Sequence, residues 1–215
     1  MNLARYASIA LLSSLSFAAV IGCDNEPGKD KAKVAASAAV TTAAVADSNA
    51  VKYVFSNTDS KLGFVGAKVT GKHDGGFNTF AGTIDLSAND PAKSSLTADI
   101  DLGSLYVDNE KLAGHLKSPD FFDVGKFTKA KFTSTSVKPG GEKGATHTVT
   151  GNLDLHGVTK SISFPATIRV AGDKVEADAE FALNRKDFAI VYPGKPDDLI
   201  KDDVLIKLTI RAKKQ

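Results

Sequence analysis

Apolar and polar residues alternate most regularly between His147 and Val170. The first run places its apolar side chains at every second position up to Leu155, and a second run does the same from Ile162 to Val170. A period of two is typical of a strand with one buried face. The break at Gly157 between the runs indicates that they form an antiparallel hairpin.

The same alternation recurs along most of the chain after residue 50. Further strands are predicted at residues 51–55, 62–70, 80–86, 96–102, 130–134, 175–183 and 204–210, which gives eight or nine strands in all. Their short connections favour an antiparallel barrel or sandwich, and closure into a barrel removes exposed sheet edges. The sequence therefore predicts an all-β domain, with a closed barrel preferred.

Three segments interrupt the strand pattern. The glycine-containing stretch from Lys72 to Gly76 is predicted to be a turn. Asn109 is expected to cap a short helix that Ser118 and the following proline end. A single helical turn is expected in residues 197–201.

The N-terminal residues have the features of an export signal. Arg5 precedes an apolar run that is too short for a membrane span and typical of a signal peptide. The only cysteine, Cys23, directly follows Gly22, an arrangement that resembles the lipobox of bacterial lipoproteins. We expect Cys23 to be the lipidated mature N-terminus; the alternative is an ordinary secretory signal with an incidental cysteine.

This prediction divides the chain into a signal peptide (1–22), a lipidated cysteine with a tether (23–50) and a β-barrel domain (51–215). Residues 24–50 are rich in Ala, Lys and Asp and lack large aromatic side chains, so they cannot bury enough apolar surface to fold. The expected location is the bacterial cell envelope, anchored by lipid and facing the periplasm, with the choice of inner or outer membrane left open.

Composition excludes several classes of function. Without residues 1–22 the chain keeps 26 Lys and Arg against 25 Asp and Glu, a net charge of +1, which does not favour nucleic-acid binding. One cysteine cannot form an intramolecular disulfide bond. The four histidines lack the spacing of a helical zinc motif, so no metal site is predicted.

The polar residues that remain favour structural roles over catalysis. His115 and His156 are expected to form hydrogen bonds at barrel ends. Asn184 and Arg185 are placed at a barrel end too, where Arg185 is expected to pair with an acid such as Asp123 or Asp187. The sequence has no G-x-S-x-G elbow and no glycine-rich phosphate loop before a helix, so an enzyme is not predicted.

The predicted inward face contains many small residues, namely Ala98, Gly151, Ala166, Ala177 and Ala179. A small barrel is either filled by its side chains or hollow enough to hold a ligand. Small inward residues are compatible with a ligand-filled cavity and equally with tight strand curvature. Both alternatives stay open, and substituting Ala177 or Ala179 with Phe is expected to distinguish them.

Several ordered motifs lie between residues 51 and 212, and they include Gly71–His73, Phe80–Ile84, His115–Asp123, Ala130–Ser134, Gly151–Lys160, Phe181–Phe188 and Asp202–Val204. Together these segments resemble the YceI-like family of exported, lipocalin-like barrels that bind polyisoprenoid lipids. The resemblance implies an eight-stranded antiparallel barrel with an apolar tunnel that is open at one end, and a helical segment near the mouth.

The leading hypothesis is a membrane-tethered protein that binds a long isoprenoid amphiphile, such as a quinone or polyprenol, for transport, storage or stress protection. The rival hypothesis is a solid-core module that interacts with or inhibits another envelope protein. No cofactor is expected besides the isoprenoid ligand, and a homodimer is left open. Candidate ligand-binding residues are Phe77, Phe80, Phe121, Phe122, Phe132, Leu153, Leu155, Phe164, Phe181 and Phe188.

Overall fold

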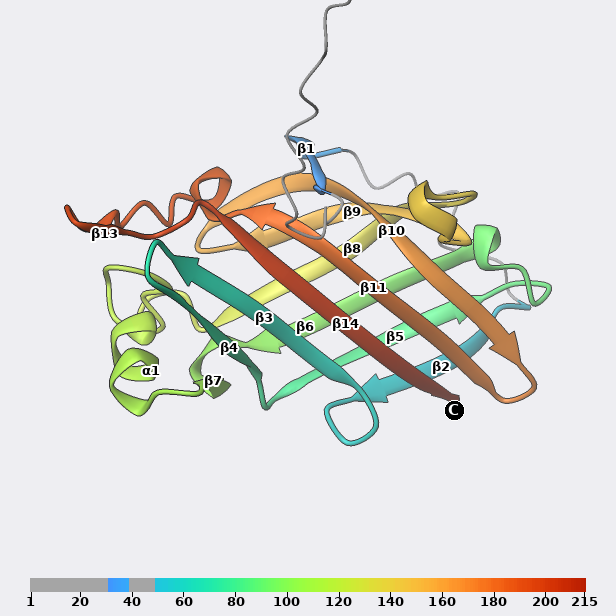
Figure 1. Ribbon diagram of the computed structural model, residues 1–215. Helices are drawn as coiled ribbons and strands as arrows, with labels where there is room; N and C mark the ends of the chain where they lie inside the picture. Colours follow the sequence, from blue (N-terminus) through green and yellow to red (C-terminus); the bar gives the residue numbers. More distant parts are fainter. Residues whose placement is uncertain (1–30, 39–48) are drawn as a thin grey trace, which may run out of the picture.

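The computed structural model describes residues 31–38 and 49–215, and most of these residues lie in strands (Figure 1). One α-helix, α1 (Glu110–Lys117), accompanies them. The strands are β1 (Lys33–Ala36), β2 (Val51–Ser56), β3 (Lys61–Lys68), β4 (Gly71–Phe77), β5 (Phe80–Leu86), β6 (Ser94–Asp101), β7 (Leu105–Val107), β8 (Lys129–Pro139), β9 (His147–Leu155), β10 (Val158–Ala171), β11 (Lys174–Asn184), β12 (Gly194–Lys195), β13 (Asp198–Leu199) and β14 (Asp203–Lys214).

Eight antiparallel strands close into a barrel in the order β2, β5, β6, β8, β9, β10, β11 and β14. The longest ladder joins β11 to β14. The ring closes where Lys213 and Lys214, at the end of β14, pair with Val54 and Tyr53 of β2. The predicted eight-stranded antiparallel barrel is therefore confirmed.

Three further strands extend one end of the barrel. The first half of β14 pairs with β3, which continues through β4 to β7. The predicted turn at Lys72–Gly76 is wrong, because these residues belong to β4. A Cβ atom at Gly75 would lie 2.5 Å from the ring of Phe64, and one at Gly76 would lie 2.7 Å from the hydroxyl of Tyr106. These glycines therefore make room for aromatic rings and do not mark a chain reversal.

The hairpin predicted around Gly157 is formed by β9 and β10. Leu155 pairs with Val158, so the turn has two residues, His156 and Gly157. Both have positive φ angles, 53° and 73°, as a type I′ turn requires. His156 Nδ1 lies 3.1 Å from the carbonyl oxygen of Phe188 and so contributes the barrel-end hydrogen bond that we expected.

A short N-terminal strand, β1, fills a gap in the barrel wall. β10 pairs with β11 only from Thr167 to Ala171, and the two strands separate beyond that point. There β1 pairs with residues 160–163 of β10, and the amide of Ala32 donates a 2.9 Å hydrogen bond to Ala182 of β11. Residues 31–38 of the predicted tether are therefore ordered, and they contribute the wall strand β1. The rest of the tether, the signal segment and Cys23 lie outside the described residues.

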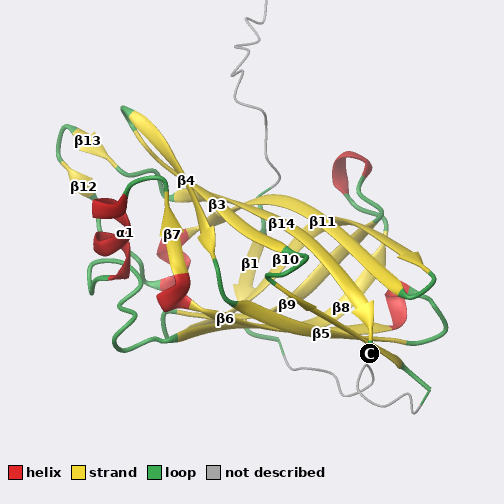
Figure 2. Ribbon diagram, turned by 90° about the horizontal axis from the view of Figure 1, so that it is seen from below, coloured by secondary structure: helices red, strands yellow, loops and turns green. Residues whose placement is uncertain are grey.

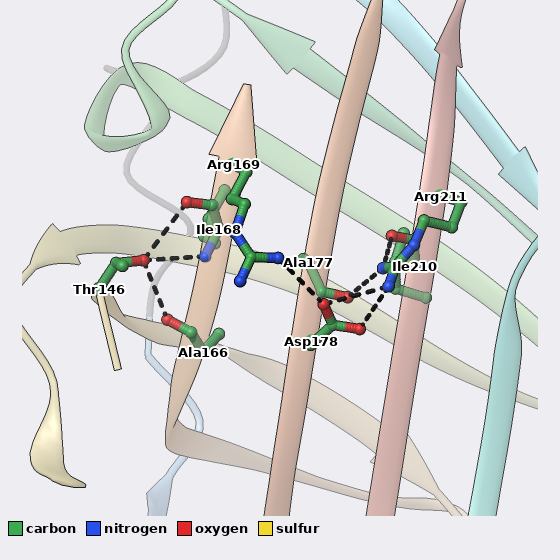
Figure 3. A network of polar contacts seen from close by, with 8 residues as sticks. All are labelled: Thr146, Ala166, Ile168, Arg169, Ala177, Asp178, Ile210 and Arg211. Atoms are coloured by element: carbon green, nitrogen blue, oxygen red, sulfur yellow. Dashed lines mark hydrogen bonds and ion pairs between the residues drawn. The ribbon is translucent and has the colours of Figure 1, made fainter. Parts of the chain in front are cut away.

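Cross-strand polar contacts tie β10, β11 and β14 together where β10 and β11 pair (Figure 3). Arg211 donates hydrogen bonds of 2.8 and 3.1 Å to Asp178, whose carboxylate is also 3.8 Å from Arg169. Beside this cluster, the amide of Ile168 donates a 2.8 Å hydrogen bond to the hydroxyl of Thr146, just before β9. These contacts are part-exposed, so each stabilises the fold by about 1 kcal/mol or less.

The ends of the barrel differ. Figures 1 and 2 place α1, β7, the β3–β4 turn and β12–β13 together at one end, which we call the mouth. The predicted helix is confirmed as α1: Asn109 accepts a 2.9 Å hydrogen bond from the amide of Leu112, and Ser118 is the C-cap. The helical turn expected at residues 197–201 is wrong, because β12 and β13 form a short hairpin there. In the described parts of the chain, no helix has the length and apolarity needed to cross a membrane.

Candidate functional site

An apolar cavity of about 880 Å³ occupies the half of the barrel next to the mouth. Its size is near the upper end of the range, about 300–1,000 Å³, that is usual for ligand pockets. Barrel strands contribute most of its wall, and α1 contributes Leu112 and Leu116 at the entrance. Apolar wall residues include Phe55, Leu62, Phe64, Leu96, Ala98, Ile100, Leu102, Ala130, Ile162, Leu183, Ile206, Leu208 and Ile210.

Most of the predicted ligand-binding residues line this cavity. The structure brings together Phe77, Phe80, Phe121, Phe122, Phe132, Leu153, Leu155, Phe164 and Phe181. Phe188 does not reach the cavity, because its side chain is fully buried in the wall cluster that includes Ile162 and Phe181. The prediction that Phe188 contacts the ligand is therefore wrong. Phe188 lies in the 3₁₀ turn that follows β11, where side chains do not alternate between two faces as they do in a strand.

A row of cross-strand partners explains why the mouth half is hollow. Phe55, Gly82, Ala98, Phe132 and Leu153 are paired in this order across five adjacent strands. Two of these five positions carry only a methyl group or a hydrogen atom, so the row leaves space in front of Ala98. Among the predicted small inward residues, Ala98 is the one that lines the large cavity.

The other half of the barrel is packed. The small residues Ala166, Ala177 and Ala179 line a separate void of about 70 Å³. Side chains that line both spaces form the partition between them: Leu96, Phe164, Leu208 and Ile210. Phe164 also stacks on Phe181 at a centroid distance of 4.3 Å. The interior is thus hollow near the mouth and filled beyond this partition.

Aromatic rings surround the entrance to the cavity. His115 of α1 lies 5.1 Å from Phe121 and 5.0 Å from Tyr192 between ring centroids, and Phe121 lies 5.2 Å from Tyr192. Phe77 contacts Phe122 with a centroid distance of 6.0 Å in an edge-to-face arrangement. The sequence did not predict Tyr192 as a lining residue, because it lies in a loop, where side chains do not alternate between two faces. Phe55 and Phe64 were predicted to lie in strands but not to line the cavity.

Arg185 holds the loops of the mouth together. Its buried guanidinium donates a 2.7 Å hydrogen bond to the carbonyl of Ile190, one of 3.2 Å to that of Lys201, and one of 3.2 Å to the carboxylate of Asp202. The expected partners Asp123 and Asp187 are wrong, because the loop after β13 brings Asp202 to the arginine. Burial lowers the pKa of Arg185, and the Asp202 carboxylate opposes this effect.

Asn184 and three more polar pairs order the same end. The side chain of Asn184 accepts a 2.9 Å hydrogen bond from the amide of Lys186. Lys68 binds Asp198, and this hydrogen bond is the main cause that lowers the pKa of Asp198. His73 Nδ1 lies 2.7 Å from Asp108, and His115 Nε2 lies 2.9 Å from Asp120.

This arrangement suits the binding of an apolar molecule that has one polar end. Apolar side chains form the interior wall, whereas the polar groups of the wall gather at the mouth, among them Lys68, Lys111, Arg185, Lys195 and Asp198. Within the described residues, no group of three or more His, Cys, Asp or Glu side chains is placed to bind a metal ion.

Comparisons with known proteins agree with this geometry. The model of the YceI-like domain matches residues 53–212. A UPF0312 protein of Pseudomonas fluorescens (strain SBW25) is 36% identical over 139 residues, which cover 62% of this chain and 71% of that relative.

Two solved structures share the fold. The structure of Burkholderia cenocepacia BcnA has a TM-score of 0.66 and 23% identity, covering 73% of this chain and 98% of that protein. A polyisoprenoid binding domain from Saccharophagus degradans, implicated in plant cell wall breakdown, has a TM-score of 0.61 and 17% identity, covering 77% and 99%. The segment that contains β1 lies outside the family match.

Proposed function

Because the chain belongs to the YceI-like domain family, we propose that the protein binds the tail of a long isoprenoid amphiphile inside the barrel. The proposed ligand is of the quinone or polyprenol class, and its polar head lies at the mouth. The observation that carries this proposal is the apolar cavity of about 880 Å³ with its single polar end. A fold neighbour that is a polyisoprenoid binding domain supports the same class of ligand.

The energetics of an apolar tail favour such a container. Removing one methylene group from water contributes about 0.8 kcal/mol, so keeping a tail of about twenty carbons dry is worth roughly 16 kcal/mol. An empty apolar cavity is costly to the fold, and a ligand that fills it stabilises the protein. The hollow interior argues against the rival hypothesis of a solid-core interaction module.

The proposal includes export and membrane attachment. The apolar run before Cys23 supports secretion, and the position of Cys23 supports lipidation. A protein anchored in this way would carry, store or protect its isoprenoid at the envelope. Replacing Cys23 with Ser tests the anchor: the variant is expected to leave the membrane fraction, and its persistence there would contradict lipidation.

The first test is to identify the ligand directly. Protein purified from its own host without detergent is extracted with organic solvent, and the extract is analysed by mass spectrometry. We expect one isoprenoid species at close to one molecule per barrel. Recovery of no isoprenoid from this material would count decisively against the proposed function.

The second test fills the cavity with a side chain. Ala98→Phe places a ring in the space between Phe55 and Phe132, so we expect loss of the extracted lipid with little change in stability. Ala166→Phe is the matched control because Ala166 is buried in the packed half. The control is expected to lower the free energy of unfolding by about 1–3 kcal/mol and to keep its lipid. Equal lipid content in wild type and Ala98→Phe would contradict this assignment of the cavity.

A further inference from the structure

Residues at the mouth alternate between the cavity and the solvent in the β3–β4 turn and in the segment around β12–β13. Lys68, Ile190 and Ile200 line the cavity. Their neighbours Val69, Val191 and Leu199 point outward and are 70%, 60% and 51% exposed. Exposed apolar side chains therefore stand directly next to residues that line the mouth of the cavity. We call Val69, Val191 and Leu199 the rim patch.

Hydrogen bonds hold the loops of the rim patch together. The amide of Val69 donates a 3.1 Å hydrogen bond to the carbonyl of Leu199, and that of Lys201 donates one of 2.8 Å to Ala67. The amide of Ile200 donates a 3.0 Å hydrogen bond to Pro193. The rim patch is thus one ordered surface built from the β3–β4 turn and the segment around β12–β13.

Exposed apolar side chains are unevenly distributed over the described residues. Besides the rim patch, the large hydrophobic residues that are exposed are Tyr106 at 45% and Val54 at 38%. Tyr106 belongs to β7, which lies at the mouth beside α1 (Figures 1 and 2). Val54 lies on β2 and pairs with Lys213 near the C-terminus, away from the mouth. Exposed apolar side chains gathered at one end of a barrel indicate a site of interaction.

The N-terminal chain enters the described structure beside the strand ends that lead to the mouth. Lys31 forms an ion pair of 2.7 Å with Asp203. The amide of Ala32 donates a hydrogen bond to the carbonyl of Ala182, and Ala182 precedes Arg185 of the mouth by three residues. Cys23 precedes Lys31 by eight residues. Eight extended residues span at most about 28 Å, so an anchor at Cys23 keeps Lys31 within that distance of the bilayer.

Local ion pairs neutralise part of the charge at the rim, and Lys72 and Lys195 are exposed beside it. Lys68 binds Asp198, and Lys186 lies 2.9 Å from Asp202. His73 is paired with Asp108. The rim therefore presents exposed apolar side chains together with a few exposed lysines. A bilayer surface satisfies this chemistry, since such side chains insert at the boundary of headgroups and acyl chains.

We propose that the rim patch docks the mouth of the barrel on the surface of a lipid bilayer. In this orientation the cavity opens directly toward the acyl chains, and an isoprenoid tail passes between membrane and barrel without crossing water. The docking surface rests on the exposed residues, whereas the anchor at Cys23 and the purpose of docking rest on the proposed function.

Tryptophan is absent from the chain, so a single substitution gives a unique fluorescent reporter. Val191→Trp is introduced into the full chain, which is mixed with phosphatidylcholine vesicles that contain brominated acyl chains. We expect the Val191→Trp emission to shift to shorter wavelength and to lose most of its intensity by bromine quenching. Val54→Trp is the matched control at an exposed position away from the mouth, and its emission is expected to stay unchanged.

The pattern of quenching decides whether the mouth of the barrel faces the bilayer. Equal quenching at both positions, or quenching at neither, overturns the docking surface. Leu199→Trp serves as a second reporter on another loop, and both substitutions are at exposed positions where folding is little affected. Quenching at position 191 without extractable isoprenoid would retain the docking surface and reject the proposed function. Extractable isoprenoid without quenching would do the opposite.

Discussion

The ring of Phe132 lies directly over Gly151, and the ring of Phe55 lies over Gly82. A Cβ atom at Gly151 would be 2.3 Å from the Phe132 ring and 2.6 Å from the carbonyl oxygen of Thr133. At Gly82 the corresponding distance to the Phe55 ring is 2.2 Å. The two glycines therefore let aromatic rings lie flat against the barrel wall, and the cavity is the space that these flat rings leave.

Gly151→Ala is expected to destabilise the protein by about 1–3 kcal/mol, since the ring can turn away but the carbonyl of Thr133 cannot. The free energy of unfolding in urea measures the effect. Gly114→Ala in α1 is the matched control: nothing lies within 4 Å of its Cβ position, and alanine favours a helix, so stability is expected to stay equal or to rise. Unchanged stability in Gly151→Ala would mean that the backbone at Thr133 shifts to accommodate the added methyl group.

Single residues show where the alternation of side chains between the two faces of a strand, here called strand parity, predicts the position of a side chain and where it does not. Parity placed Leu153, Phe164 and Phe181 on the inner face, and they line the cavity. It could not choose between a hollow and a filled interior, because both require the same side chains inside. The partner of Arg185 was missed because Asp202 is 17 residues away and is brought close by the loops of the mouth.

At the scale of elements, the mouth depends on carboxylates that bind cations. The pKa of Asp202 is lowered chiefly by its hydrogen bond with Lys186, and that of Asp198 by its hydrogen bond with Lys68. A lowered pKa means that the folded form gains stability above the unfolded value, about 3.9 for Asp. This contribution is lost as the pH falls below that value and through the folded pKa.

We therefore expect the loops around β12–β13 to loosen in acid, below about pH 4, and to be unaffected between neutrality and pH 5. Amide chemical shifts of Thr70 and Ile200 followed through a pH titration measure this change. Asp198→Asn should abolish the acid-induced change in the amide chemical shift of Thr70, because this amide lies 3.1 Å from the Asp198 carboxylate. A transition near pH 6.5 would instead indicate control by a histidine.

Elements with regular alternation were predictable from the sequence, and elements without it were not. β9, β10 and β11 were found by period two, and α1 was found from the Asn109 cap and the Ser118-Pro119 end. β4 was missed because its glycines read as a turn, although they accommodate the Phe64 and Tyr106 rings. β1, β12 and β13 have four residues or fewer, so they carry too little pattern to be recognised.

At the scale of the whole molecule, the closed ring depends on pairings between distant segments. β14 joins β2 through residues more than 150 positions apart in the chain, and parity specifies no such partner. The count of eight strands and the tunnel came from the family resemblance, whereas the location of the cavity required the structure. The result is a barrel that is filled on one side of the Phe164 partition and hollow on the other.

The strand β1 covers edges that the ring itself leaves open. A chain that begins at Val51 keeps all eight barrel strands but exposes residues 160–163 of β10 and Ala182 near the end of β11. Unpaired edges of this kind pair with other chains. We expect this shortened protein to self-associate in sedimentation velocity experiments while the full chain with Lys31→Ala, which loses one exposed ion pair, stays monodisperse. A monodisperse shortened protein would show that the edges are protected in another way.

If Cys23 anchors the protein as proposed, the seam that β1 occupies links release of the barrel to its state of assembly. A protease that cuts between β1 and β2 would leave β1 on the N-terminal fragment and release the barrel with an unpaired seam. Release by such a cut would then produce a species prone to strand exchange, whereas a cut before Lys31 would release an intact barrel. The position of cleavage, a property of the N-terminal chain alone, would thus decide whether the liberated protein remains a single molecule.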